Sequence, residues 1–168
     1  MNYEKALKFL EKTFPNNQYN IIGHCKAVSN LAYDIAKKLK ANGIYIDIEK
    51  VRVAALLHDI GRANGTENHS VDGGKILRAL GKKEIAEIIE RHGSGFEETN
   101  DENHLPKTIE DKIVIYADSR VDFDKIVTVE ERIESLRRRY TGNKRDILEK
   151  TVKRHEKLIR EIEDMLNE

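Results

Sequence analysis

The sequence predicts an all-α fold, a single compact bundle of about seven to eight helices that uses residues 1–168 as one domain. Apolar residues recur at intervals of three and four along almost the whole chain, the spacing of one face of a helix. No stretch alternates convincingly with a period of two, and the only strand-like segment is Ile44-Tyr45-Ile46. A chain of 168 residues is long enough to bury a core without disulfides.

Three helices are expected in the first third of the chain. The first covers about Tyr3 to Phe14 and ends at a proline, and the second runs from about Asn20 to Lys40 before an Asn-Gly turn. Asp47 is a suitable N-cap for the third helix. His24 and His58 fall on the apolar faces of the second and third helices, so both imidazoles are expected to point into the core.

The middle of the chain predicts two further helices and one long loop. The helices cover about Ser70 to Leu80 and Lys82 to Arg91, with Gly81 between them. The polar segment from Gly93 to Lys107 is the longest loop and the best candidate for a mobile lid or the rim of a substrate site. His104 lies in this loop and is expected at the surface.

The last part of the chain contains two capping boxes, in which a threonine is followed three residues later by an acidic residue. They begin at Thr108 and Thr128. The first starts a helix that runs through Asp118, and the second starts a helix that ends near Tyr140. The last helix is expected from about Lys144 to Leu166.

The strongest functional pattern is His58-Asp59-Ile60-Gly61, where an apolar helical run ends. An imidazole and a carboxylate are natural ligands for a divalent metal. Neighbouring side chains diverge around the axis of a regular helix, but a turn at Gly61 lets His58 and Asp59 converge on one point. The pair therefore predicts a metal site at the end of the third helix.

Two residues on other helices are candidates for the same site, and each has an alternative. Asp118 follows a run of aliphatic residues, where a carboxylate is costly to bury without a partner. A metal would satisfy it, and so would a salt bridge to Arg120 or Arg62. For His24, the alternative is a core histidine that is bonded only to a backbone carbonyl.

The order of these residues resembles the HD-domain superfamily of metal-dependent phosphohydrolases. His24 comes first, then the His58-Asp59 pair, then Asp118, all on helical segments, and residues 58–61 look like the superfamily signature in its HDIG form. The likeness spans roughly residues 18–125. It implies one HD domain, on which the C-terminal helices of about residues 128–166 pack, and it implies that these four residues hold a metal.

The same resemblance extends to two more histidines. In some HD-domain groups two extra histidines between the pair and the late aspartate hold a second metal, which the aspartate of the pair bridges to the first. His69 and His92 lie in segments that are similar to those extra-ligand segments. The alternative is that they face a substrate pocket or solvent. His155, which lies amid lysines and arginines, is expected on a solvated helix face.

Several cations are candidates for binding phosphate. Arg62 follows the metal motif directly, in a place suited to bidentate contact with phosphate oxygens, and it is expected to stabilise the negative charge of a transition state. Asp59 and Arg62 are thus the predicted catalytic residues. Lys75 and Arg91 could reach the same pocket, although each is expected to be an ordinary surface charge. The cluster at residues 137–139 is expected on a solvated helix face.

Composition limits the partners and the cofactors. Lys plus Arg and Asp plus Glu number 30 each, so no net basic field favours long nucleic acid. Cys25 is the only cysteine, which excludes a disulfide within the chain and indicates a reducing, cytoplasmic compartment. Neither a signal peptide nor a membrane span is expected. Imidazoles and carboxylates without thiolate suit Mn²⁺, Fe²⁺, Co²⁺, Ni²⁺ or Zn²⁺, as one ion or two.

Three functions follow from the resemblance. The first is a metal-dependent phosphohydrolase that acts on a nucleotide or another small phosphate ester through metal-activated water. The second is a di-iron oxygenase, which requires both His69 and His92 to bind iron. The third is a non-catalytic sensor that binds a nucleotide. The bond type, the metal and the oligomeric state, including a homo-oligomer, stay open.

Overall fold

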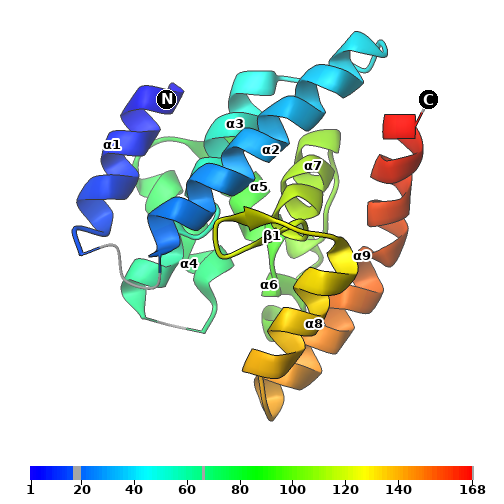
Figure 1. The fold of residues 1–168 in the computed structure, drawn as a ribbon. Helices are drawn as coiled ribbons and strands as arrows, with labels where there is room; N and C mark the ends of the chain where they lie inside the picture. The colour runs from blue at the N-terminus through cyan, green and yellow to red at the C-terminus, as the bar shows by residue number, and fades with distance from the viewer. Residues whose placement is uncertain (17–19, 66, 168) are drawn as a thin grey trace.

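The computed structural model describes residues 1–16, 20–65 and 67–167, and it confirms the all-α prediction (Figure 1). Nine α-helices lie in these residues, one more than expected, together with two 3-10 helices and two very short strands. The elements are α1 (Tyr3–Thr13), α2 (Ile21–Ala41), α3 (Ile48–Leu57), η2 (Ile60–Asn64), α4 (His69–Ala79), α5 (Lys83–His92), α6 (Gly95–Thr99), η3 (Glu102–His104), α7 (Ile109–Asp118), β1 (Val121–Asp122), β2 (Lys125–Ile126), α8 (Val129–Arg139) and α9 (Asn143–Asn167).

Local sequence determines most of the helix ends. The side chains of Thr108 and Thr128 each accept a hydrogen bond from the backbone N–H three residues on, and both capping boxes are complete. Asp47 caps α3 through the N–H of Lys50. Among residues 1–16, 20–65 and 67–167, none of the helices combines the length and the apolar character needed to cross a lipid bilayer.

The core lies where α2, α3, α5 and α7 meet. Their apolar faces bury Cys25, Val28, Leu57, Ile89 and Ile113, so Cys25 is a small core residue. Figure 1 shows α8 and α9 side by side along one flank of the bundle, with the β1–β2 hairpin between α2 and α8. This placement puts the C-terminal helices beside the ends of the helices that carry the predicted ligands.

The strand prediction at Ile44–Ile46 is wrong. The segment is the irregular link between α2 and α3, and the N–H of Ile44 donates to the carbonyl of Leu39 at the end of α2. Ile46 is buried and Tyr45 is exposed, so the apolar spacing there reflects packing of a linker. The two strands lie instead at Val121–Asp122 and Lys125–Ile126, too short to show any alternation.

The segment from Gly93 to Lys107 is not one long loop, because it contains α6 and η3. His104 is buried there, contrary to expectation, and its Nδ1 lies 2.9 Å from the hydroxyl of Thr99. The carboxylate of Asp111 accepts from the N–H groups of Lys107 and Thr108, which ties the end of the segment to α7. The segment is thus folded against α7 at its end, and its role as a mobile lid or substrate rim stays a prediction.

His155 is also buried, with 7% of its surface exposed, where a solvated face was expected. Its charged neighbours mislead because Arg154 turns back toward α6 and binds the carboxylate of Glu97 and the carbonyl of Gly93. Lys153 is exposed, as the sequence suggests. The imidazole of His155 therefore faces the interior, between α9 and α7.

We expect His155 to weaken the fold in acid. Burial, followed by the charge of Arg154, lowers its pKa to about 3, so the folded state keeps the ring neutral while the unfolded chain protonates near the ordinary pKa of 6.5. The unfolded state binds more protons between these values, so the free energy of unfolding falls as the pH drops from about 6.5 toward 3. In His155→Leu, the fall between pH 7 and pH 4.5 should be smaller by about 2 kcal/mol in urea unfolding.

The matched control is Lys153→Leu, which adds the same side chain at an exposed position of the same helix. It should lose as much stability as the wild type over this pH range. The difference between the two variants therefore reports on the buried position of residue 155. Equal losses in the wild type and His155→Leu would show that this ring contributes nothing to the pH dependence.

Candidate metal centre

The His58-Asp59 pair lies at a turn that the backbone makes between two helical elements. His58 is the C-cap of α3, and Asp59 has φ −95° and ψ 10°, just before η2. Gly61 permits the next step, because a Cβ there would lie 2.0 Å from the carbonyl oxygen of His69 and 2.5 Å from the amide nitrogen of Gly73. The start of α4 can thus pack against the turn, which brings His69 to Asp59.

The structure brings all six predicted ligand residues into one cluster, although they come from five helices and a turn. His24 Nε2 lies 3.0 Å from Asp118 Oδ1, and His58 Nε2 lies 3.7 Å from the same oxygen. His58 Nε2 is also 3.7 Å from Asp59 Oδ2, and His69 Nε2 is 3.2 Å from Asp59 Oδ1. The ring of His92 lies 5.0 Å from that of His58 and 5.4 Å from that of His69.

Three of the imidazoles are oriented by backbone carbonyls. The Nδ1–H of His24 donates to Phe123 O, that of His58 to Ala55 O, and that of His92 to Ile89 O, with distances of 2.6–2.7 Å. A ring that donates from Nδ1 presents the lone pair of Nε2, which is the arrangement of a metal-binding histidine. The His24 ring is bonded to a backbone carbonyl and its Nε2 also faces Asp118, so it is more than a core histidine bonded to a carbonyl, and its role as a metal ligand stays a prediction.

The charges of the cluster suit a cation. Burial alone raises the pKa of Asp59, but the charge of Arg62 and the nearby histidines lower it more, so it lies well below the ordinary value. Burial likewise raises the pKa of Asp118, but the hydrogen bond from His24 and the charge of His58 bring it below the ordinary value. Burial lowers the pKa of His69 to about 3 and that of His92 to about 4. Burial lowers the pKa of His24, but its contact with Asp118 raises it above the ordinary value. The ionised carboxylates and the neutral rings of His69 and His92 are in the ligand states that metals require.

The residues present fit a divalent metal. Among the described residues, His58 Nε2 and Asp59 Oδ1 are buried side-chain atoms without a hydrogen-bond partner. Donor atoms of His24, His58 and Asp118 lie within 4.8 Å of one another, and so do those of His58, Asp59 and His92. A metal would satisfy these atoms, and such a nitrogen and oxygen set suits Mn, Fe, Co, Ni or Zn without selecting one.

The helix ends add to this preference. His58, His92 and Asp118 stand at the C-terminal ends of α3, α5 and α7. The C-terminus of a helix carries partial negative charge, so three converging ends favour a cation.

The salt bridges suggested for Asp118 are not formed. Arg120 turns to the carbonyl of Val127 and the hydroxyl of Tyr116, and the Nε of Arg62 lies 2.7 Å from Asp59 Oδ2. The cation near Asp118 is Arg132, whose Nη2 lies 3.8 Å from Asp118 Oδ1. Sequence reasoning missed Arg132.

The other candidate cations divide between the site and the surface. Lys75 is a surface charge that pairs with Asp72, as expected. Arg91 is not an ordinary surface charge, because its side chain is only 12% exposed and pairs with the buried carboxylate of Asp111. Neither residue lines the cavity. Within the cluster 137–139, Arg137 binds Glu149 and Arg138 is 67% exposed near Glu134, as expected of a solvated face. Arg139 departs from that expectation, because it lines the cavity beside the cluster of ligand-type residues.

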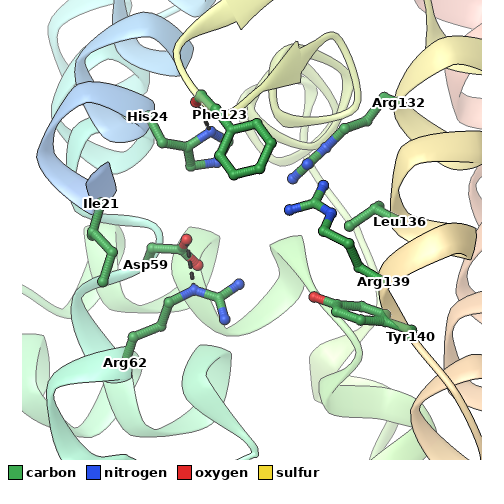
Figure 2. Close-up of a pocket in the computed structure, with 9 residues that line it drawn as sticks. All are labelled: Ile21, His24, Asp59, Arg62, Phe123, Arg132, Leu136, Arg139 and Tyr140. Atoms are coloured by element: carbon green, nitrogen blue, oxygen red, sulfur yellow. Dashed lines mark hydrogen bonds and ion pairs between the residues drawn. The ribbon is translucent and has the colours of Figure 1, made fainter. Parts of the chain in front are cut away.

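A cavity of about 330 Å³ opens beside this cluster (Figure 2). Figure 2 shows the guanidinium groups of Arg62, Arg132 and Arg139 directed toward its centre. A second cavity of about 400 Å³ shares Arg62 and Tyr140 with the first and reaches His69. Arg132, Leu136 and Arg139 are spaced as one helix face, the pattern that could have revealed this side of the site.

Known proteins share sequence features with this chain. The family model described as HD domain matches residues 21–121. An uncharacterized protein of Methanocaldococcus jannaschii is 40% identical over 156 residues, which is 85% of this chain and 89% of that protein. A tRNA (cytidine(56)-2'-O)-methyltransferase of Thermoplasma volcanium is 36% identical over 129 residues, 71% of this chain, and the match spans only 37% of the methyltransferase.

Solved structures share the fold. The HD domain of the phosphodiesterase PgpH from L. monocytogenes has a TM-score of 0.56 at 19% identity, with 94% of each chain covered. The same domain in complex with cyclic-di-AMP has a TM-score of 0.55 at 20% identity and covers 94% of this chain and 92% of that one. At 19% and 20% identity, these comparisons show a shared fold alone.

We expect His58→Ala to abolish metal binding, because His58 belongs to both groups of donor atoms. After loading with Mn²⁺ and desalting, the metal content of the variant, measured by elemental analysis, should be about tenfold or more below that of the wild type. His104→Gln is the control, since His104 is a buried histidine bonded to Thr99 outside those groups. It should retain wild-type metal. Wild-type metal content in a folded His58→Ala protein would place the ion elsewhere.

Proposed function

Because the chain belongs to the HD domain family, we propose that it is a metal-dependent phosphohydrolase that acts on a nucleotide or another small phosphate ester. The observation that carries this proposal is that the cluster of metal-ligand residues adjoins a cavity lined by arginines. A buried cluster of histidines and aspartates opens onto a cavity into which three guanidinium groups point. Guanidinium groups are suited to the planar, bidentate recognition of phosphate.

In this proposal His24, His58, Asp59 and Asp118 would hold a first ion, and His69 and His92 would contribute to a second position together with Asp59. When bound, such a metal lowers the pKa of water and supplies positive charge against a phosphoryl oxygen. The chain's own residues do the positioning.

Arg62 is placed to act on the phosphate itself. Its Nε is held by Asp59 Oδ2 at 2.7 Å, which fixes the guanidinium beside the cluster, and Figure 2 shows its terminal nitrogens turned toward the cavity. A fixed cation loses little side-chain entropy when it meets the extra negative charge of the transition state. Arg132, close to Asp118, is placed to neutralise the same phosphate from the opposite wall.

The alternatives share the ligands and differ in what the cavity accepts. A di-iron oxygenase would use the same histidines and aspartates, but three arginines around the opening favour a phosphorylated substrate. A nucleotide sensor would need the cavity without hydrolysis. Relatives named for tRNA methylation, and a neighbour bound to cyclic-di-AMP, make RNA ends and cyclic dinucleotides worth including among the test compounds.

We expect metal-dependent release of phosphate or nucleotide from a panel of esters. The panel comprises nucleoside monophosphates and diphosphates, cyclic-di-AMP and a short RNA with a terminal phosphate, incubated with chelator-stripped protein with and without added Mn²⁺. Arg62→Met should lower kcat by about 10²-fold, because it removes a charge that acts on the transition state. Asp59→Ala should be inactive.

Lys75→Met is the matched control, because Lys75 is 69% exposed and pairs with Asp72 away from the cavity. It should keep wild-type kcat and KM. Activity that survives removal of the metal, or that Asp59→Ala retains, would refute the metal-dependent mechanism. A protein that binds metal but releases nothing from any compound would favour the oxygenase or the sensor, and iron would then be tested.

A further inference from the structure

Arg132 and Arg139 are held as a pair by one carboxylate. The Nη1 of Arg132 lies 2.8 Å from Asp122 Oδ1, and the Nη2 of Arg139 lies 2.7 Å from the same oxygen. Ser135 donates to the other oxygen of Asp122 at 2.7 Å, so the carboxylate is fixed in its turn. The carboxylate of Asp122 neutralises only one of the two guanidinium groups, so the trio keeps a net positive charge. Arg132 and Arg139 both line the cavity, so this charge lies on the cavity wall.

The β1–β2 hairpin presents this carboxylate at some cost in backbone energy. Phe123, in the turn after Asp122, has φ +54°, a left-handed conformation that is unusual and strained for an aromatic residue. The strained turn directs the carbonyl of Phe123 to the ring of His24 and places its side chain 4.8 Å from the guanidinium of Arg139. One turn thus links a predicted metal ligand to the arginine pair.

The two arginines differ in their distance from the predicted ligands. Arg132 is the inner one, because its Nη2 lies 3.8 Å from Asp118 Oδ1 and its side chain is only 12% exposed. Arg139 lies about two helical turns farther along α8, and 37% of its side chain is exposed. No contact joins it to the predicted ligands in the described part of the chain. Both positions lie beyond residues 21–121, so membership of the family does not account for them.

We propose that Arg132 and Arg139 form a subsite for a second phosphate group, next to the phosphate that is cleaved, and that the substrate class is compounds with a diphosphate group. The proposal deepens the proposed function and relies on it for the position of the cleaved phosphate. Arg62 and Arg132 flank the phosphate that is cleaved. Arg132 therefore lies between the two phosphate positions and serves both. Arg139 shares its anchor with Arg132, so it is within reach of the adjoining phosphate of a diphosphate, and Phe123 holds it there.

The test is a binding measurement on the full chain after the metal has been stripped, so it does not depend on turnover. Inorganic pyrophosphate, orthophosphate, ADP, AMP and cyclic-di-AMP are titrated by calorimetry. We expect pyrophosphate to bind at least tenfold more tightly than orthophosphate, and ADP more tightly than AMP. Arg139→Met should reduce the affinity for pyrophosphate and ADP at least tenfold and change the affinity for orthophosphate less than twofold.

Arg138→Met is the matched control, since Arg138 is the next residue on α8 and its side chain points to solvent near Glu134. It should bind every compound as the wild type does. An equal effect of both variants would reduce the role of Arg139 to general charge. Equal losses for orthophosphate and pyrophosphate, or no loss at all, would refute a second-phosphate subsite.

The remaining outcomes also separate the two proposals. A loss in Arg139→Met that is confined to cyclic-di-AMP would replace the diphosphate with the paired phosphates of a dinucleotide, and so would refute the proposed class. Binding of pyrophosphate that depends on Arg139, in a protein that hydrolyses nothing, would support the subsite and refute the proposed hydrolase. Hydrolysis of monophosphates alone, unaffected by Arg139→Met, would support the proposed hydrolase and refute the second-phosphate subsite.

Discussion

Two ionised carboxylates, the buried Asp59 and the partly exposed Asp118, lie close to His58 in a helical bundle, and the arrangement around them follows from the cost of withdrawing them from water. Each has a pKa below its ordinary value although burial by itself would raise it. Charges of this kind are tolerated in an interior only when they are paired or coordinate a metal. The structure supplies partial compensation through Arg62, His24 and Arg132. It leaves Asp59 Oδ1 and His58 Nε2 without hydrogen bonds among the described residues, and a bound cation would complete what these partners begin.

The backbone takes part in the same compensation. Three ligand-type residues stand at C-terminal helix ends, where partial negative charge favours a cation, and three imidazoles are oriented by carbonyl groups. These arrangements do not need long-range charge, which fits a chain with equal numbers of acidic and basic residues. Gly61 supports a different part of the site, because any side chain there would push the start of α4, and with it His69, away from Asp59.

The sequence predicts well what is local. Helix periodicity and the boxes at Thr108 and Thr128 determine elements within a few residues, and the spacing of His24, the His58-Asp59 pair and Asp118 identifies residues that the structure brings together. It fails where tertiary packing decides. His155 sits among basic residues that look solvated, but Arg154 folds back on Glu97 and leaves His155 inside.

The hairpin strands fail for a related reason, since two-residue strands have no period to detect. Arg132 and Arg139 were hidden differently. The sequence of α8 is typical of a solvated helix. In the structure, Asp122 and the turn at Phe123 hold one face of α8 against the cavity. The spacing of Arg132, Leu136 and Arg139 marks one face of α8, but only the contacts with Asp122 and with the turn at Phe123 show that this face lines the cavity.

The C-terminal helices connect recognition to the buried cluster at two points, and this restricts how either can change. At one point, α8 reaches His24 through Asp122 and the carbonyl of Phe123. At the other, Arg154 of α9 binds the carbonyl of Gly93, directly after His92. A change in the cavity wall that moves α8 or α9 also moves a histidine of the cluster. A new substrate preference is therefore most easily reached by exchanging a side chain such as Leu136, which lines the cavity and takes part in neither connection, while the helix positions are kept.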